Sequence, residues 1–186
     1  RKCEQSGKQR QQTQYGYGNR QFENTDSLFL KKRRVIDKGN TEVVAEYIKE
    51  MTGADVFRIM PDKEYEKIQD YDELVELTRI EHENDERPTF NGKINDIGKY
   101  DTIFIGSPIW WYTFPQVMYT FLDSYDLNGK TIIPFTTHEG SGLADVVEVL
   151  RKYYPNATVA EGLAIRGRDA VKSKEKVVRW LEKTGF

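Results

Sequence analysis

The chain has 186 residues, of which 38% are hydrophobic and 31% charged, and these proportions are typical of one globular domain with a single buried core. No apolar run approaches the roughly 18 residues that a membrane span needs, and no signal-peptide pattern is present, so we expect a cytoplasmic protein without a membrane partner. The one cysteine, Cys3, excludes an internal disulfide, and two isolated histidines predict no metal site.

The charge is divided unevenly between the start of the chain and the rest. Residues 1–34 carry nine Lys/Arg and three Asp/Glu, a net charge of about +6, which leaves about −8 for the remainder. An acidic body argues against nucleic-acid binding by the main domain. Residues 1–26 are polar without apolar periodicity and are predicted to be irregular. A short strand could form at 27–30, and the basic run 31–34 is either a solvated loop or a nuclear or nucleic-acid signal.

From residue 35 onward, strand patterns and helix patterns alternate. In chain order, the sequence predicts a helix at 43–51, a strand at 54–59, a polar helix at 71–85, a buried strand at 100–106, a helix at 115–125, a strand at 130–135, a helix at 143–150, a strand at 157–165 and a closing helix at 177–181. This alternation is typical of βαβ units and a parallel sheet. Ligands of such sheets bind at the carboxyl ends of the strands, so the loops there are the candidates for function.

The first candidate loop, Gly39-Asn40-Thr41, stands directly before the first helix. A glycine allows close backbone approach, and the free N–H groups of a helix start favour a phosphate. The alternative is that the side chain of Asn40 or Thr41 caps the helix.

The second candidate loop follows the buried strand and consists of Ser107, Pro108, Ile109, Trp110, Trp111 and Tyr112. Three consecutive aromatic residues at the end of a strand cannot all face the core. A flat aromatic ligand would account for their exposure, because ring stacking and exclusion of water both stabilise such a complex. The alternative is that two of them pack under the following helix.

The third candidate loop, Thr136 to Gly142, again joins a strand to a helix. Its candidate ligand-binding residues are Thr137, His138, Gly140, Ser141 and Gly142. Two glycines around a serine at a helix start predict a tight turn that is rich in N–H donors. A single histidine at such a place is more often a structural hydrogen-bonding group than a catalytic base.

Taken together, the three loops resemble those of the flavodoxin family, particularly its longer bacterial members with a Pro-Ile-Trp-Trp loop and a Thr-His-x-Gly-Ser-Gly loop. The resemblance covers residues 35–186 and includes the segment 161–165. It implies a flavodoxin-like three-layer α/β sandwich with a five-stranded parallel sheet in the order 2-1-3-4-5 and a non-covalently held FMN. By that resemblance, residues 39–41 match the phosphate loop, residues 108–112 flank the isoalloxazine ring and the ribityl chain, and residues 138–142 border the other edge of the ring.

The stretch before Gly39 departs from the family pattern. Family members begin with a strongly apolar central strand, whereas residues 31–38 here are mostly charged, which leaves only 28–30 or 35–36 as a degenerate first strand. The serine or threonine that precedes the Gly-Asn-Thr in the family is also missing. We therefore divide the chain into an atypical N-terminal segment, 1–34, and an FMN-binding domain, 35–186. We hypothesise that the segment 1–34 is not the native N-terminus of the family, as a misread reading frame would explain.

The function that the resemblance implies is electron transfer by bound FMN, with a redox partner protein or a small electron acceptor as the partner. The flavin carries the chemistry, so no catalytic acid or base is predicted. Two alternatives remain open at this point: an FMN-dependent reductase of the NAD(P)H:quinone type, and a flavin-free domain that serves only in interaction. Mg²⁺ chemistry on the same fold would need a cluster of acidic residues at a strand end, and no such cluster is visible in the sequence.

Overall fold

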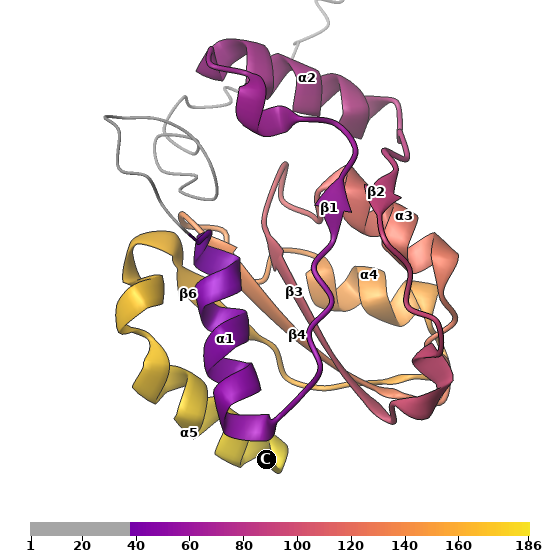
Figure 1. Ribbon diagram of the computed structural model, residues 1–186, viewed down its shortest axis with the longest axis vertical. Coiled ribbons are helices and arrows are strands. Elements are labelled where there is room, and N and C mark those ends of the chain that lie inside the picture. Colours follow the sequence, from indigo (N-terminus) through magenta and orange to yellow (C-terminus); the bar gives the residue numbers. More distant parts are fainter. Residues whose placement is uncertain (1–37) are drawn as a thin grey trace, which may run out of the picture.

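A parallel sheet with helices on both faces forms the centre of the structure, a computed structural model that describes residues 38–186 (Figure 1). The predictions for residues 1–37, namely the irregular start, the short strand and the basic run, lie outside the described residues. The prediction of an α/β protein with a parallel sheet is confirmed.

Within residues 38–186 the sheet has three strand positions. β3 (Thr102–Pro108) pairs in parallel with β4 (Thr131–His138), and β4 pairs in turn with β5 (Thr158–Val159) and β6 (Leu163–Arg166). β5 and β6 share one position, because they pair with the first and the last part of β4 respectively. The predicted strand at 157–165 is therefore present, with an interruption at 160–162.

Two helices cover each face of the sheet. α1 (Asn40–Thr52) and α5 (Lys174–Thr184) lie on one face, and α3 (Gln116–Ser124) and α4 (Val146–Tyr153) lie on the other (Figure 1). Successive residues of β4 point to opposite faces, so Ile132 packs with α3 and α4, whereas its neighbour Ile133 packs with α1 and α5. This double burial explains why β4 reads as a continuous apolar run in the sequence.

The helix ends follow local sequence signals. α1 ends at Gly53, whose φ of 71° is the left-handed conformation that glycine adopts at low cost, as the sequence predicts. α3 begins directly after Pro115, which also agrees with the prediction. α5 ends in the same way as α1, at Gly185.

The chain between α1 and β3 forms a lobe, defined here as residues 60–91, which lies above the carboxyl ends of the strands (Figure 1). It consists of β1 (Met60–Pro61), the 3₁₀ turn η1 (Tyr65–Lys67), α2 (Tyr71–Glu83) and β2 (Phe90–Asn91), with β1 and β2 paired antiparallel. The 3₁₀ turn η2 (Ile97–Lys99) then leads into β3. Asp70 caps the start of α2, because its side chain accepts hydrogen bonds from the amides of residues 72 and 73.

No sheet strand is seen at 54–59 among the described residues, and the first strand, its expected neighbour, lies outside them. Residues 54–59 have no sheet partner among the described residues, although Phe57 and Ile59 pack against the apolar core as the alternating pattern predicts. Alternation reports which side chains face the core and does not require pairing. In the part of the chain that the structure describes, β3 likewise pairs on one side only. Of the predicted strand order 2-1-3-4-5, these residues show the part 3-4-5, formed by β3, β4 and β5.

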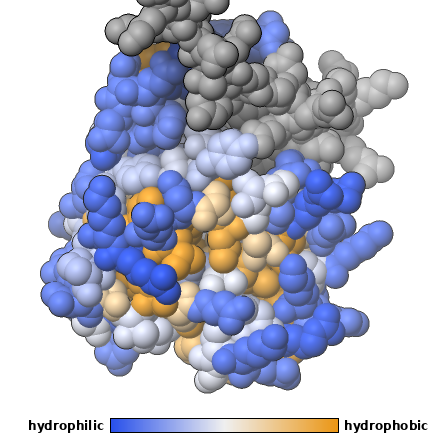
Figure 2. Space-filling view, turned by 180° about the vertical axis from the view of Figure 1, so that it is seen from behind, coloured by the Kyte–Doolittle hydropathy of each residue, from blue (hydrophilic) through white to orange (hydrophobic). Residues whose placement is uncertain are grey.

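Apolar residues also reach the surface on the face opposite to that of Figure 1. Figure 2 shows them gathered in the middle of this face, between hydrophilic residues. Among the helices of residues 38–186, none has the length and the apolar composition that crossing a bilayer would require.

Candidate functional site

The pairing of β3 with β4 brings the second and third candidate loops together. Ser107 lies opposite Thr136 in the sheet, and Pro108 lies opposite Thr137. The pairing continues past the end of β3, because the amide of Ile109 donates to the carbonyl of Thr137 at 3.1 Å. Both loops therefore start from the same edge of the sheet, as parallel strands require.

The first candidate loop joins the same edge through a side-chain contact. The hydroxyls of Thr41 and Thr137 are hydrogen-bonded at 2.6 Å, although 96 residues separate them. Gly39 is the N-cap residue of α1 and, as a glycine, has no side chain that could cap this helix start. The alternative that Asn40 or Thr41 caps the helix is therefore wrong: both residues lie inside the helix. An uncapped helix start presents backbone N–H groups and a positive dipole end, which suit an anion.

Gly167 lies against this helix start, and the sequence analysis did not single it out. A Cβ at this position would stand 2.6 Å from Oε1 of Glu139 and 2.8 Å from Nδ2 of Asn40, so both side chains meet at this glycine. The neighbouring Arg166 donates to the carbonyl of Glu139 at 2.9 Å. Gly167 begins the 3₁₀ turn η3 (Gly167–Lys172), directly after β6. In the sequence, the only signal for this contact is a glycine shortly after the predicted strand at 157–165.

The second candidate loop contains an unusual turn. Trp110 and Thr113 form two backbone hydrogen bonds with each other, of 3.0 and 2.9 Å, which close a two-residue hairpin loop around Trp111 and Tyr112. Both central residues have positive φ, 51° for Trp111 and 63° for Tyr112, as a type I′ turn requires. We refer to residues 110–113 as the aromatic turn.

The backbone of the aromatic turn is strained. Asn-Gly is the usual central pair of a type I′ turn, because residues with a larger side chain pay roughly 1–2 kcal/mol each for a left-handed backbone. Two adjacent aromatic residues in this conformation must be held by their surroundings, and such strain is found preferentially at functional sites. No sequence signal for this turn exists, since Trp-Trp-Tyr-Thr contains none of the usual turn residues.

The two tryptophans of the aromatic turn pack against the lobe. The ring of Trp110 meets that of Tyr65 edge-on, with 5.8 Å between the ring centroids. The ring of Trp111 stacks on that of His82, with 6.4 Å between the centroids and an angle of 11° between the ring planes. The indole N–H of Trp111 also donates to the hydroxyl of Thr78 at 3.3 Å. Two of the three aromatics are therefore packed against the protein, as the alternative expects. Their ring contacts are with the preceding lobe, however, and not with the helix that follows.

Tyr112 differs from the tryptophans, because its side chain is exposed. Its backbone carbonyl accepts from the amide of Asp145 at 3.4 Å, which ties the aromatic turn to the residue that precedes α4. Ser107 and Ile109, by contrast, are buried; Ile109 belongs to the core, and the hydroxyl of Ser107 donates to the carbonyl of Pro108.

The third candidate loop is held in a tight turn. The buried hydroxyl of Thr136 donates to the carbonyl of Gly142 at 2.9 Å, and Gly142 has a φ of 65°. Gly140 and Gly142 both have open space where a Cβ would stand. The amide of Ala144 donates to the carbonyl of Ser141 at 3.1 Å, which continues the turn toward α4.

His138 ends β4 with a buried polar atom in its ring. Its Nδ1 is buried and forms no hydrogen bond with the residues that the structure describes, although the sequence suggested a structural hydrogen bond. Burial lowers the pKa of this histidine below its ordinary value, and the nearby Arg166 and Lys176 lower it further. The ring is therefore neutral at pH 7, with a buried nitrogen that a bound ligand could satisfy.

These features fit FMN in three respects. The uncapped start of α1 suits a phosphate, the aromatic turn suits a flat ring, and the buried Nδ1 of His138 offers a polar contact at the same edge of the sheet. A metal site is not indicated, because residues 38–186 hold no group of three His, Cys, Asp or Glu side chains that could bind an ion.

The fold and the site together define a flavodoxin-like α/β protein, with its candidate ligand site at the carboxyl ends of the strands. The chain belongs to the flavodoxin family, whose model matches residues 35–184. Among the curated proteins, no sequence matches this one.

Solved structures share this fold. Two of them, each described as a "putative flavoprotein", come from Bacteroides eggerthii and Bacteroides uniformis. They are 31% and 30% identical to this chain, cover 78% and 76% of it and 90% of their own length, and both have a TM-score of 0.67. A flavoprotein from Lactobacillus acidophilus in complex with FMN is 20% identical, with a TM-score of 0.55 over 73% of this chain and 90% of its own.

Proposed function

We propose that residues 35–186 bind FMN and that the protein transfers electrons. The observation that carries this proposal is the hydrogen bond between Thr41 and Thr137, which joins the start of α1 to the edge of the sheet from which the aromatic turn and the His138 loop begin. The FMN complex of the Lactobacillus flavoprotein, which has the same fold, supports the choice of ligand.

In this proposal each end of the site has its own role. The backbone N–H groups of residues 39–41 bind the phosphate. The aromatic turn and residues 138–142 flank the isoalloxazine ring, exclude water from it and orient it. Bound FMN supplies the redox chemistry by taking up and releasing electrons, and the protein sets how readily it does so.

The acidic character of the domain bears on the reduction potential. Residues 35–186 carry a net charge of about −8, and negative surroundings disfavour a reduced flavin that is itself anionic. We therefore expect a lower potential than that of free FMN. The partner in this proposal is a redox protein or a small electron acceptor in the cytoplasm, and the same negative charge disfavours a nucleic acid.

An FMN titration tests the proposal. The purified apoprotein is titrated with FMN while flavin fluorescence and the visible absorption spectrum are recorded. Quenching at a ratio of one FMN to one chain, with a shifted absorption band, is the expected result. A colourless protein that takes up no FMN would contradict the proposal and support the flavin-free interaction domain.

A stepwise reductive titration of the FMN complex separates an electron carrier from a reductase. Two resolved one-electron steps support the carrier that we propose. A single two-electron step, together with turnover of NAD(P)H and a quinone, would support the reductase instead.

A further inference from the structure

Three groups of the lobe meet two consecutive residues of the aromatic turn. Tyr65 of η1 contacts Trp110, whereas Thr78 and His82 of α2 both contact Trp111. Thr78 and His82 are four residues apart, so they lie on the same side of α2, one turn apart. One of them accepts the indole N–H and the other lies parallel to the indole ring, and together these contacts define both the position and the tilt of Trp111.

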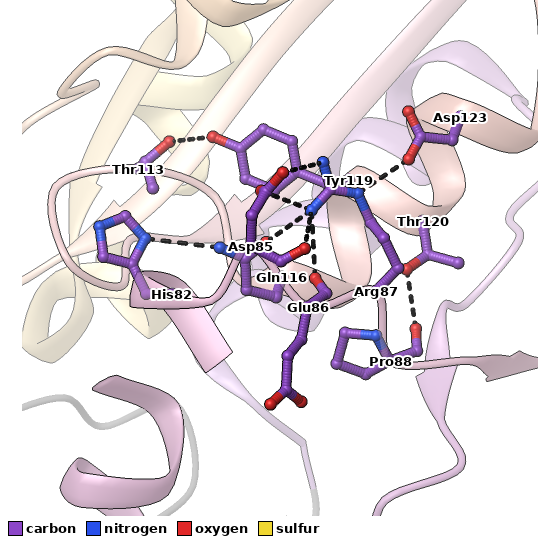
Figure 3. Close-up of polar contacts among 10 residues, drawn as sticks. All are labelled: His82, Asp85, Glu86, Arg87, Pro88, Thr113, Gln116, Tyr119, Thr120 and Asp123. Carbon is purple, nitrogen blue, oxygen red and sulfur yellow. Dashed lines mark hydrogen bonds and ion pairs between the residues drawn. The ribbon is translucent and has the colours of Figure 1, made fainter. Parts of the chain in front are cut away.

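His82 is also connected to the helix on the other side of the turn (Figure 3). Its Nδ1 stands 3.4 Å from Nε2 of Gln116, a buried residue at the start of α3. Oε1 of Gln116 accepts in turn from Arg87 at 3.3 Å, which orients the amide so that its N–H points at His82. The imidazole ring is thus held between the indole and the amide.

The far end of the aromatic turn is held by α3 as well. The hydroxyl of Thr113 is hydrogen-bonded to that of Tyr119, whose ring lies under the guanidinium of Arg87 at 5.2 Å (Figure 3). The turn is therefore fixed at its second residue by α2 and at its last residue by α3. The residue between, Tyr112, is the exposed one.

We propose that Thr78 and His82 are positioning residues for the flavin: they hold Trp111 in its strained conformation, so that the aromatic turn is preformed for the isoalloxazine ring. This inference rests on the proposed function. It extends the site to a helix that none of the three candidate loops includes. α2 does not belong to the phosphate end of the site. We nevertheless expect its two side chains to influence the affinity for FMN and the reduction potential of the bound flavin.

Other contacts hold the lobe together and attach it to the domain. Within the lobe, the buried Glu81 accepts from the hydroxyl of Tyr65 at 2.9 Å and from Lys63 at 2.6 Å, and burial raises the pKa of Tyr65, so this donor stays protonated. Arg87 reaches Asp123 of α3 at 2.8 Å. Removing the side chain of His82 should therefore leave the lobe in place and affect mainly the turn.

Four variants test the proposal. H82A removes the stacked ring, H82F restores a ring without the nitrogen, and T78V removes the acceptor for the indole N–H. I80A is the matched control, because Ile80 lies on α2 with 39% of its surface exposed. Each variant is measured for FMN affinity, for the reduction potential of the bound flavin, and for the denaturant midpoint.

A further readout needs no flavin. In the ¹⁵N-labelled apoprotein, the indole N–H signal of Trp111 reports its hydrogen bond to Thr78 and the ring current of His82. We expect H82A and T78V to shift this signal, and T78V to speed its exchange with solvent. I80A should leave it unchanged.

We expect H82A and T78V to weaken FMN binding by about threefold to tenfold, the range that a lost aromatic pair or hydrogen bond produces, with a changed potential. H82F should bind FMN almost as the parent does, and the denaturant midpoints of H82A and I80A should be similar. If the parent protein binds FMN and the variants bind it with the same affinity and potential, the positioning role is overturned while the proposed function stands. If the parent takes up no FMN, both the proposed function and the positioning role fail.

Discussion

The two ends of the candidate site are built in different ways. The end that we propose for the phosphate is the start of α1, where backbone N–H groups and a glycine are presented in the ordinary geometry of a helix start. The end that we propose for the ring is the aromatic turn, where two non-glycine residues with positive φ are contacted or flanked by side chains from α2 and α3. The first end needs little more than its own local sequence, whereas the second depends on contacts far away in the chain.

This difference has a consequence for mutational sensitivity. A site made of backbone groups tolerates changes elsewhere, as long as its helix stays in place. A strained turn relaxes when the contacts that hold it are lost, because its own conformation is the less stable one. Remote substitutions should therefore affect the ring end more than the phosphate end.

The largest effect is expected from a substitution that disturbs the frame shared by both ends. Gly106 of β3 lies under the ring of Phe135 of β4, and a Cβ there would stand 2.0 Å from the ring. Phe135 is buried and cannot move aside freely, so G106A should lower the free energy of unfolding by about 1–3 kcal/mol. Denaturant unfolding measures this loss.

The double variant G106A/F135L is the control for this prediction. The smaller leucine vacates part of the space of the ring, so the added methyl group should cost less in this background than in the parent. Equal costs in both backgrounds would show that the overlap with Phe135 is not the cause.

The second effect concerns the ring end alone. T113V keeps the shape of Thr113 but leaves the hydroxyl of Tyr119 without this partner, in a half-buried position. We expect a loss of about 1–2 kcal/mol in unfolding free energy, since an unsatisfied polar group in such a place is costly. A double-mutant cycle with Y119F should show coupling, because the second substitution removes the group that the first one leaves unsatisfied. Additive losses would mean that the two hydroxyls act independently.

The third prediction compares two positions of the ring end that share a positive φ, Tyr112 and Gly142, and expects effects of opposite sign. Y112G places a glycine at a φ of 63° and should raise the unfolding free energy of the apoprotein by about 0.5–1 kcal/mol, because the strain is relieved. G142A places a side chain at a φ of 65° in the third loop and should lower it by about 1 kcal/mol. The added Cβ of G142A meets no atom within 4 Å, so its cost is that of the backbone alone. Effects of the same sign would refute the assignment of strain to the aromatic turn.

The smallest effect is a pH dependence that comes from His138. Burial lowers the pKa of this histidine in the folded protein below its ordinary value of 6.5, so the unfolded chain binds the proton more readily. The contribution of His138 to stability is complete above pH 6.5 and is lost as the pH falls toward the lower, folded pKa. Unfolding curves between pH 5 and pH 8 should show this decline in the parent and a weaker one in H138Q. Parallel curves would exclude His138 as the source.

The sequence predicted the elements of the fold better than their partners. The helices of α1, α3 and α5 and the strands β3 and β4 have apolar patterns that local reasoning detects, and Gly53 and Pro115 define two of their ends. The stretch 54–59 has an equally regular pattern but no sheet partner among the described residues. A pattern of burial says which side of a segment faces the core, and pairing depends on what lies beside it.

The same limit applies to the candidate site. Residue types and their order along the chain were enough to identify the three loops, because glycines, aromatics and a histidine at strand ends are visible in one dimension. The sequence by itself thus determined the fold class, the family and the edge of the sheet that carries the loops. Only the tertiary structure showed that Gly167 meets Asn40 and Glu139, that Thr41 meets Thr137, and that α2 holds Trp111. Such contacts join residues many positions apart, and the two positive φ angles of the aromatic turn lie where these neighbours meet it, so no local pattern in the sequence reports them.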